Sequence, residues 1–214
     1  SSGTAFANRN SDYSNRIADI NPNDIESVVI LKGPEATAQF GSDGASGAIV
    51  VTTKKGRAGR TSLNYNNSFS FSEVYRFPQL QEVYTRGSDG VFDPNSYNAT
   101  YGYRFFGPRY AEGTKFYDNI QNFFQNGKAQ RHGVSLTSGT NILNYRLSAG
   151  YFTSNGVVPN TTLEQYTFNI SATAQLRKNI NLQTDIFYTN SANDKAPKGQ
   201  GTYYLNLITY PRDV

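Results

Sequence analysis

The chain has 214 residues, a formal net charge of +4 at pH 7 and a mean hydropathy of -0.58. It has no cysteine, which excludes a disulfide framework, a thiolate metal site and a cysteine nucleophile. It also lacks an apolar run of the roughly 18 residues that a transmembrane helix needs, whereas the half-apolar strands of a transmembrane barrel stay allowed. Its 16 tyrosines and 14 phenylalanines, set among many Asn, Ser, Thr and Gly residues, indicate β-structure with one wet face.

The first predicted unit lies between residues 24 and 56. Two apolar runs, at 25–31 and 48–51, have the pattern of strands that are covered on both faces. Between them we predict a short helix over 34–40, because proline suits the first helical position and Gly41 suits a left-handed stop. A unit of this size buries too little surface to fold alone, so we expect it to be held inside something larger.

Several motifs of this unit occur in a fixed order and spacing. They are Asn-Pro-Asn-Asp-Ile-Glu-Ser at 21–27, Leu-Lys-Gly-Pro at 31–34, Phe-Gly-Ser at 40–42, Gly47, and Thr-Thr-Lys-Lys-Gly at 52–56. The unit resembles the second half of the plug domain of TonB-dependent outer-membrane transporters of the SusC/RagA family. Glu35, Thr37 and the Asp43-Gly44 pair depart mildly from the family pattern. The resemblance implies a plug structural motif of Gly33, Pro34, Gly41, Gly44, Gly47 and Gly56.

The densest basic cluster, Lys-Lys-Gly-Arg-Ala-Gly-Arg at 54–60, follows this unit. A surface that binds nucleic acid would interleave aromatic residues with these cations, and this segment has none. We therefore predict a solvated linker at 57–60 and no nucleic-acid partner.

Long segments of alternating polar and apolar residues follow the linker and predict five strands. The strands are expected at about 61–75, 130–138, 144–153, 164–176 and 180–190. A strand of roughly 13 residues, tilted by about 40°, rises about 33 Å, which is enough to cross a bilayer. Tight turns alternate with long connections, above all a loop at 76–129, as in outer-membrane barrels.

Five strands of this length cannot close a barrel and would leave two bare edges. The chain also begins without Met or a signal segment, so we expect it to be a fragment or a processed piece. The resemblance continues through Asn126-Gly127, 144–152 and 155–158, and it implies a complete barrel of about 22 strands.

These observations predict a partial transmembrane antiparallel β-barrel of about five strands with part of an α/β plug domain. The expected division is 1–56 for the C-terminal part of the plug, 57–60 for the linker and 61–214 for the N-terminal part of the barrel.

The long loop holds the strongest candidate for ligand binding. Aromatic rings beside Asn and Arg donors can stack on sugar-like or flat ligands, and they can equally pin the loop against the barrel or the plug. The candidate substrate-binding residues are Tyr97, Tyr101, Tyr103, Phe105, Phe106 and Tyr110. A short amphipathic helix is expected near the end of the loop, from the spacing of Phe116, Ile120, Phe123 and Phe124.

Catalytic and metal chemistry find no support in the sequence. His132 is the only histidine, and the scattered carboxylates form neither a triad nor an acid pair. The acidic loop at 89–95 offers oxygen ligands for calcium but lacks the glycine and terminal glutamate of an EF-hand. The helix start near Gly33 lacks the P-loop pattern. We predict that the chain is not an enzyme and has no cofactor or metal, with calcium unsupported.

The family resemblance implies TonB-dependent import of an oligosaccharide or a peptide across the outer membrane of a Gram-negative bacterium. It implies a SusD-like surface lipoprotein as a lid, TonB acting through a segment upstream of the chain, and a lipid bilayer around the barrel. Two alternatives stay open: a barrel of the same family that serves as a structural or interaction scaffold, and a secreted β-sandwich that binds glycans through the aromatic loop.

Overall fold

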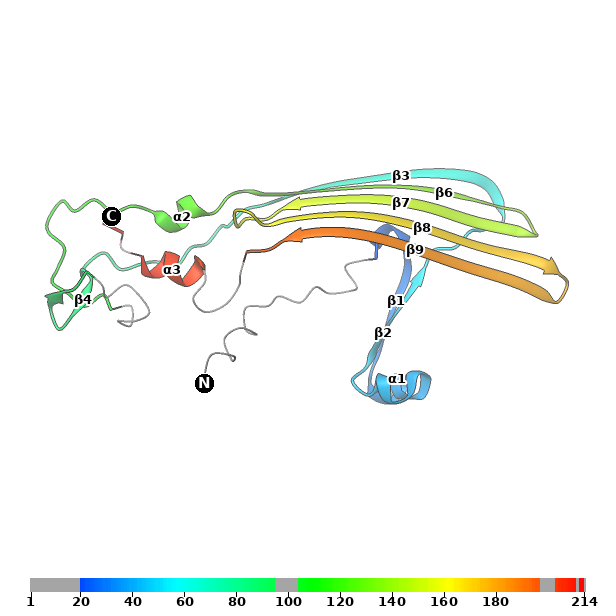
Figure 1. Cartoon of the computed structure of the whole chain (residues 1–214), viewed down its shortest axis with the longest axis horizontal. Coiled ribbons are helices and arrows are strands. Elements are labelled where there is room, and N and C mark those ends of the chain that lie inside the picture. The colour runs from blue at the N-terminus through cyan, green and yellow to red at the C-terminus, as the bar shows by residue number, and fades with distance from the viewer. Residues whose placement is uncertain (1–19, 95–103, 197–202, 211, 214) are drawn as a thin grey trace.

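The computed structural model describes residues 20–94, 104–196, 203–210 and 212–213. Its main body is one antiparallel sheet of five strands in the order β3-β6-β7-β8-β9. The sheet is long and curved, and a small hairpin unit stands on its concave side (Figure 1). The strands are β3 (Gly59–Ser72), β6 (Gly127–Gly139), β7 (Leu143–Asn155), β8 (Thr162–Arg177) and β9 (Ile180–Asp194).

These strands have 13 to 16 residues each, well above the usual 5 or 6. The two turns at one end, 140–142 and 178–179, are tight, whereas the connection between β3 and β6 spans 73–126. β6 begins at Gly127, earlier than the expected 130, because its ladder with β7 continues to Lys128 opposite Asn155. Backbone pairing does not require apolar side chains, so alternation alone could not reveal these residues.

The register gives the sheet two chemically distinct faces. We call the concave face, which faces the hairpin unit, the inner face, and the opposite one the outer face. One outer row joins aliphatic side chains in register across all five strands, and the neighbouring inner row is mostly small and polar. The outer row is Leu63, Leu136, Leu147, Ile170 and Ile186; the inner row is Asn64, Ser135, Ser148, Asn169 and Phe187.

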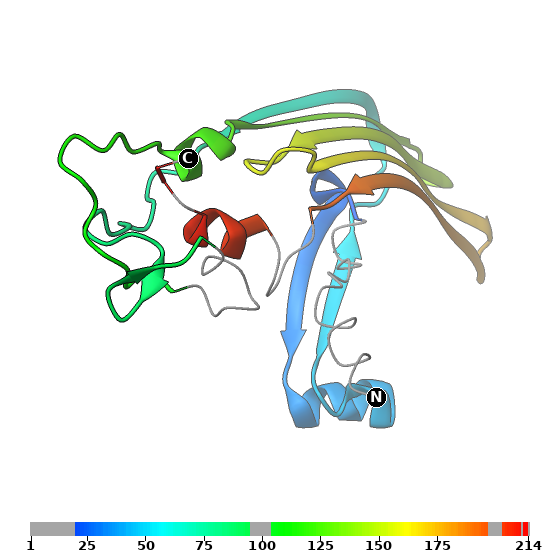
Figure 2. The ribbon, with the colours of Figure 1, turned by 60° about the vertical axis from the view of Figure 1, so that its left-hand side comes forward.

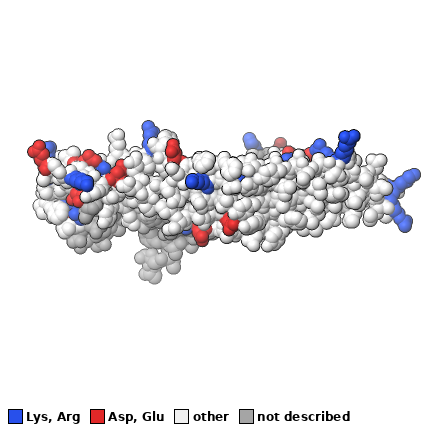
Figure 3. Space-filling view, turned by 90° about the horizontal axis from the view of Figure 1, so that it is seen from above, with Lys and Arg blue, Asp and Glu red and all other residues white. Residues whose placement is uncertain are grey.

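The outer face is not covered by any other part of the chain that the structure describes. Leu63, Ile186 and Tyr188 expose 71%, 51% and 59% of their surfaces. Seen from this side, the strands form a broad surface with charged side chains mainly near its edges (Figure 3). Large exposed apolar surfaces of this kind mark sites of interaction with a membrane or another protein. No helix among the described residues is long and apolar enough to cross a membrane.

The hairpin unit comprises β1 (Ile25–Leu31), α1 (Gly33–Phe40), a 3-10 turn at Gly41–Gly44 and β2 (Ala48–Thr53). β1 and β2 pair antiparallel, from Leu31 opposite Ala48 to Ile25 opposite Thr53. α1 begins one residue before the expected position, and Gly41 ends it with a φ of 66°. The predicted helix between two strands is therefore present, with Gly41 in the positive-φ region that suits glycine.

The prediction that both strands of this unit are covered on both faces is wrong for the part of the chain that the structure describes. Val28, Val29 and Ile30 expose 52%, 48% and 68% of their surfaces. The reason is geometric, because the unit projects from the sheet and touches it at its base, with α1 at the far end (Figure 2). The apolar run alone does not reveal which neighbours cover it.

The long connection contains little regular structure among its described residues. β4 (Gly87–Ser88) and β5 (Val91–Phe92) form a small hairpin, and the expected helix is the single-turn α2 (Asn119–Phe123). Ile120 of α2 is 5% exposed, and Asp118 caps the helix by accepting a hydrogen bond from the Gln121 N–H. α3 (Tyr203–Thr209) packs beside it, with the Tyr203 ring stacked on Phe123.

The two faces of β8 predict that an added charge destabilises the fold strongly on the outer face and only slightly on the inner face. Lysine in place of Ile170, in the middle of the outer face, should lower the free energy of unfolding in bilayers by about 2–4 kcal/mol. Lysine in place of Thr173, on the inner face of the same strand, should change it by about 0.5 kcal/mol or less. Denaturant unfolding of the complete receptor folded in bilayers, followed by circular dichroism, measures both. Equal losses would contradict the assignment of the faces.

Candidate functional site

The candidate functional site is the contact between the base of the hairpin unit and the inner face of the sheet. It begins with a turn at residues 21–24. The Asn21 side chain accepts a hydrogen bond from the Asn23 N–H at 3.1 Å, and the Asp24 N–H donates to the Asn21 carbonyl at 2.9 Å. Proline suits the first position of the 3-10 helix Pro22–Asp24 because its missing N–H has no helical acceptor there. Local sequence thus fixes the shape of this turn.

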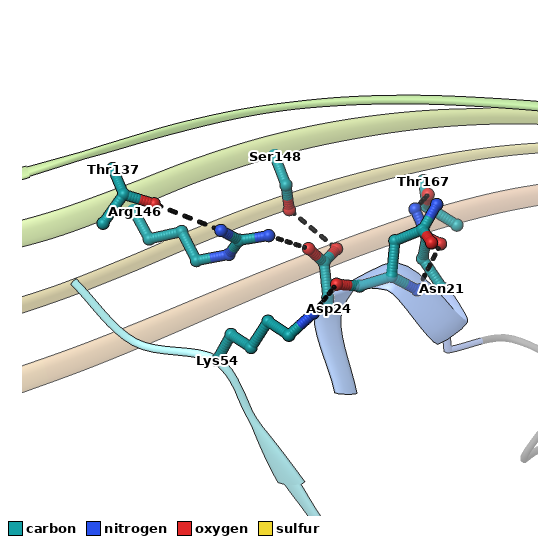
Figure 4. Close-up of polar contacts among 8 residues, drawn as sticks. Asn21, Asp24, Lys54, Thr137, Arg146, Ser148 and Thr167 are labelled. Carbon is teal, nitrogen blue, oxygen red and sulfur yellow. Dashed lines mark hydrogen bonds and ion pairs between the residues drawn. The ribbon is translucent and has the colours of Figure 1, made fainter. Parts of the chain in front are cut away.

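Asp24 connects the turn to the sheet through its carboxylate (Figure 4). One oxygen accepts a hydrogen bond from Arg146 Nη2 at 2.9 Å and the other from Ser148 Oγ at 2.7 Å. Arg146 Nη1 donates in turn to Thr137 Oγ1 at 3.1 Å. Asp24 and Arg146 are 4% and 7% exposed, so neither charge can be left alone without a large desolvation cost.

The second strand of the unit ends at the same turn. The Lys54 N–H donates to the Asp24 carbonyl at 2.8 Å, and Lys54 Nζ donates to the Asn23 carbonyl at 2.9 Å. The turn between residues 21 and 24 therefore fixes the start of β1, the chain after β2 and the position of both on the sheet.

Two glycines of the sheet make room for this turn. Gly133 of β6 and Gly150 of β7 are paired in register. A Cβ on Gly133 would lie 2.9 Å from Asn23 Nδ2, and a Cβ on Gly150 would lie 2.6 Å from Thr167 Oγ1 and collide with the Asn21 amide. Asn21 Nδ2 also donates to Thr167 Oγ1 at 3.5 Å. We call this gap in the inner face the glycine notch, defined by Gly133 and Gly150.

A cavity of about 520 Å³ lies beside this contact, between the base of the hairpin unit and strands β8 and β9. Its lining combines Val51 and Lys55 of the unit side with Asn169, Asp185 and Phe187 of the sheet. Among the described residues, the unit therefore contacts the sheet directly at the turn and is separated from it by a cavity on the β9 side.

The six predicted motif residues lie mostly within the hairpin unit. Gly33 and Pro34 open α1, Gly41 follows it, and Gly44 and Gly47 lie between α1 and β2. Gly56 lies at the sheet, where a Cβ would overlap the backbone of Tyr145. A mechanical role for these residues stays a prediction.

The predicted aromatic loop is only partly described. Tyr97, Tyr101 and Tyr103 lie outside the described residues. Phe106 is 70% exposed, and Phe105 pairs with Gly87 through a backbone bridge.

The described aromatic residues mostly secure the loop. The Tyr110 ring packs edge-on against Phe116 at 4.9 Å, and its hydroxyl donates to Asp213 at 3.5 Å. Burial, followed by the charge of Asp213, raises the pKa of Tyr110. A pocket lined in part by Phe105 and Tyr110 has a volume of about 90 Å³, about that of three waters. Ligand binding by this loop stays a prediction.

Comparisons with known proteins point to one kind of receptor, although no protein-family model matches the chain. The chain is 33% identical to the TonB-dependent receptor SusC of Bacteroides thetaiotaomicron, over 73% of this chain and 15% of that protein. It is 29% identical to the TonB-dependent receptor P3 of Formosa agariphila, over 81% of this chain and 16% of that protein. The chain thus spans less than a fifth of the length of these relatives.

Solved structures show the same fold. The structure of the RagAB peptide transporter matches with a TM-score of 0.72 at 18% identity, over 92% of this chain and 25% of that chain. A RagAB peptide importer in its closed-closed state matches with a TM-score of 0.70 at the same identity and coverage. The described sheet and hairpin unit are therefore a partial barrel with part of a plug, as the sequence predicted.

The buried ion pair predicts that substitutions of Asp24 and Arg146 have large effects that are not additive. In the protein folded in bilayers, Asp24→Asn or Arg146→Gln alone should lower the free energy of local opening at β1 by about 3–5 kcal/mol, because each leaves a buried charge unpaired. The double variant should lose less than the sum. Amide hydrogen exchange of β1 and β2 measures this opening.

The matched control is the exposed ion pair between Arg57 and Glu26, whose side chains are 81% and 42% exposed. Arg57→Gln should change the free energy of local opening at β1 by at most about 1 kcal/mol. If Asp24→Asn proved as mild as this control, the pair would not hold the hairpin unit.

The glycine notch predicts that an added methyl group weakens the contact between the turn and the sheet. Gly150→Ala should lower the free energy of local opening at β1 by about 1–3 kcal/mol, because the methyl group would displace Asn21. Gly33→Ala, where a Cβ meets nothing within 4 Å, should leave it unchanged. The same exchange experiment tests both variants. Equal protection of β1 in the two variants would show that the glycine notch does not shape the contact between the hairpin unit and the sheet.

Proposed function

Because the chain belongs to the family of SusC/RagA-like TonB-dependent receptors, we propose that it forms part of an outer-membrane importer of large nutrients. The observation that carries the proposal is the contact between the base of the hairpin unit and the inner face of the sheet. A small α/β unit is attached by a buried ion pair to the polar face of a sheet whose other face is apolar. This is the arrangement that a plugged transmembrane barrel requires.

We assign residues 1–56 to the C-terminal part of the plug, 57–60 to the linker and 61–214 to the N-terminal part of the barrel. β3 begins at Gly59, so this strand includes the last two residues of the proposed linker and starts two residues before the proposed barrel bound. In this assignment the short turns face the periplasm and the long connection faces outward, since outer-membrane barrels have short periplasmic turns.

The geometry suggests how the plug is held and released. Among the described residues, Asn21 donates a hydrogen bond to the inner face, and the Asp24 contacts follow three residues later. Force that TonB applies to a segment upstream of the chain would therefore reach the turn at residues 21–24 before it reached β1 or β2. The cavity between the hairpin unit and strands β8 and β9 would give the plug space to move without breaking the barrel wall.

The substrate in this proposal is an oligosaccharide or a peptide, captured at the long-loop end under a SusD-like lipoprotein. The names of the RagAB structures support the peptide class for those proteins, and the exposed Phe106 supports aromatic contacts at this end. The chain performs no bond chemistry in this account.

Uptake by cells tests the proposal. Deleting the TonB-contacting segment of the complete receptor should abolish growth on its nutrient while the receptor still reaches the outer membrane. Panels of oligosaccharides and peptides as sole nutrients identify the substrate class. A receptor that supports equal growth with and without the segment on every nutrient would instead be the scaffold of the alternative hypothesis.

A further inference from the structure

The half of the sheet nearest the short turns carries four cations and one acid. In its strand segments 59–65, 133–139, 143–149, 168–177 and 180–188, and in the two turns between them, the charged residues are Arg60, Arg146, Arg177, Lys178 and Asp185. Arg146 points inward to Asp24. Arg60, Arg177 and Lys178 are exposed, and Asp185 lines the cavity beside the hairpin unit on the inner face.

The other cations near this end already have partners or point inward. Arg57 pairs with Glu26 at 2.9 Å, and Lys54 Nζ donates to the Asn23 carbonyl. Lys55 lines the cavity beside the hairpin unit. At the tip of the sheet opposite the long loops, Figure 3 shows Lys and Arg but no acidic side chain.

Exposed apolar side chains lie directly beside these cations. Ile142 of one short turn is 66% exposed, and Leu176 and Ile180 on either side of the other are 61% and 50% exposed. Apolar groups followed at once by Lys and Arg are the pattern of a surface at a lipid boundary, where the stems stay in hydrocarbon and the charged ends reach the headgroups.

The spacing favours several small anions over one. Arg60 is on β3, and β8 with Arg177 lies three strands away in the sheet order, which is about 14 Å. The cations are thus spread along a rim, and a single phosphate ligand could not contact them together.

We propose that this rim, consisting of Arg60, Arg177 and Lys178, binds the phosphate groups of anionic glycerophospholipids in the leaflet that the short turns meet. The inference depends on the sheet spanning a membrane and does not depend on transport. It goes beyond the proposed import function, because it assigns a lipid preference to one end of the barrel.

The experiment uses the complete receptor in bilayers of phosphatidylcholine with a minor fraction of phosphatidylglycerol. Mild detergent extraction followed by mass spectrometry of the retained lipid measures the enrichment of phosphatidylglycerol. The wild-type receptor should retain phosphatidylglycerol in excess of its bilayer fraction. Each cation removed should lower the local preference by about fivefold, the equivalent of about 1 kcal/mol.

The test variant is Arg60→Gln with Arg177→Gln and Lys178→Gln. The control variant, Arg76→Gln with Lys115→Gln and Lys128→Gln, removes the same charge from the long-loop side. Heat-dependent gel migration verifies that both barrels are folded. Loss of enrichment in the test variant alone supports the proposal, and weakening of the wild-type enrichment by high salt agrees with it.

Three results would overturn the proposal: equal enrichment in the test variant and the wild type, equal loss in both variants, or no enrichment in the wild type. Replacing phosphatidylglycerol by lipopolysaccharide distinguishes the two sources of lipid phosphate, since the proposal predicts that the rim variant retains as much lipopolysaccharide as the wild type. Nutrient uptake plays no part in this measurement, so failure of the import proposal would leave its result unchanged.

Discussion

The ion pair between Asp24 and Arg146 is the interaction on which the arrangement of the chain depends. It joins residues 122 positions apart and places the start of β1 on the inner face of the sheet. Because the Asp24 carbonyl also accepts a hydrogen bond from Lys54, the same residue fixes the chain after β2. A buried pair of this kind adds little net stability over an apolar contact but strongly penalises separation of its partners. It therefore specifies where the hairpin unit sits.

One alternation of side chains gives the sheet two functions. The inner positions of β7 supply Arg146, Ser148 and Gly150 to the seat of the hairpin unit, while the outer positions supply Leu147 and its neighbours to an apolar surface. A shift of register by one residue would exchange these faces, remove the ion pair and turn polar side chains toward lipid. The seat and the lipid surface are thus specified together, and the basic rim lies where that surface ends.

The sequence predicted the features that depend on local patterns. Five long strands follow from period-two alternation, and the short helix follows from Gly33-Pro34 and Gly41, because neighbouring residues determine these elements. The seat could not be predicted in the same way. Arg146 was visible as a polar residue of an alternating strand, but nothing local joins it to Asp24, and the Gly133–Gly150 notch exists only once the register of β6 and β7 is known. The apolar run in β1 predicted burial incorrectly because such a run does not say which neighbour covers it.

The most direct test of the account is a cross-link across the glycine notch in the complete, membrane-embedded receptor. The chain has no cysteine of its own, and a Cβ on Gly133 would lie 2.9 Å from the Asn23 amide. The account predicts that Asn23→Cys combined with Gly133→Cys forms a disulfide in the oxidising cell envelope, whereas Asn23→Cys combined with Ser68→Cys on β3 does not. No disulfide in the first variant, or equal yields in both, would show that the turn is not seated in the notch and would contradict the account.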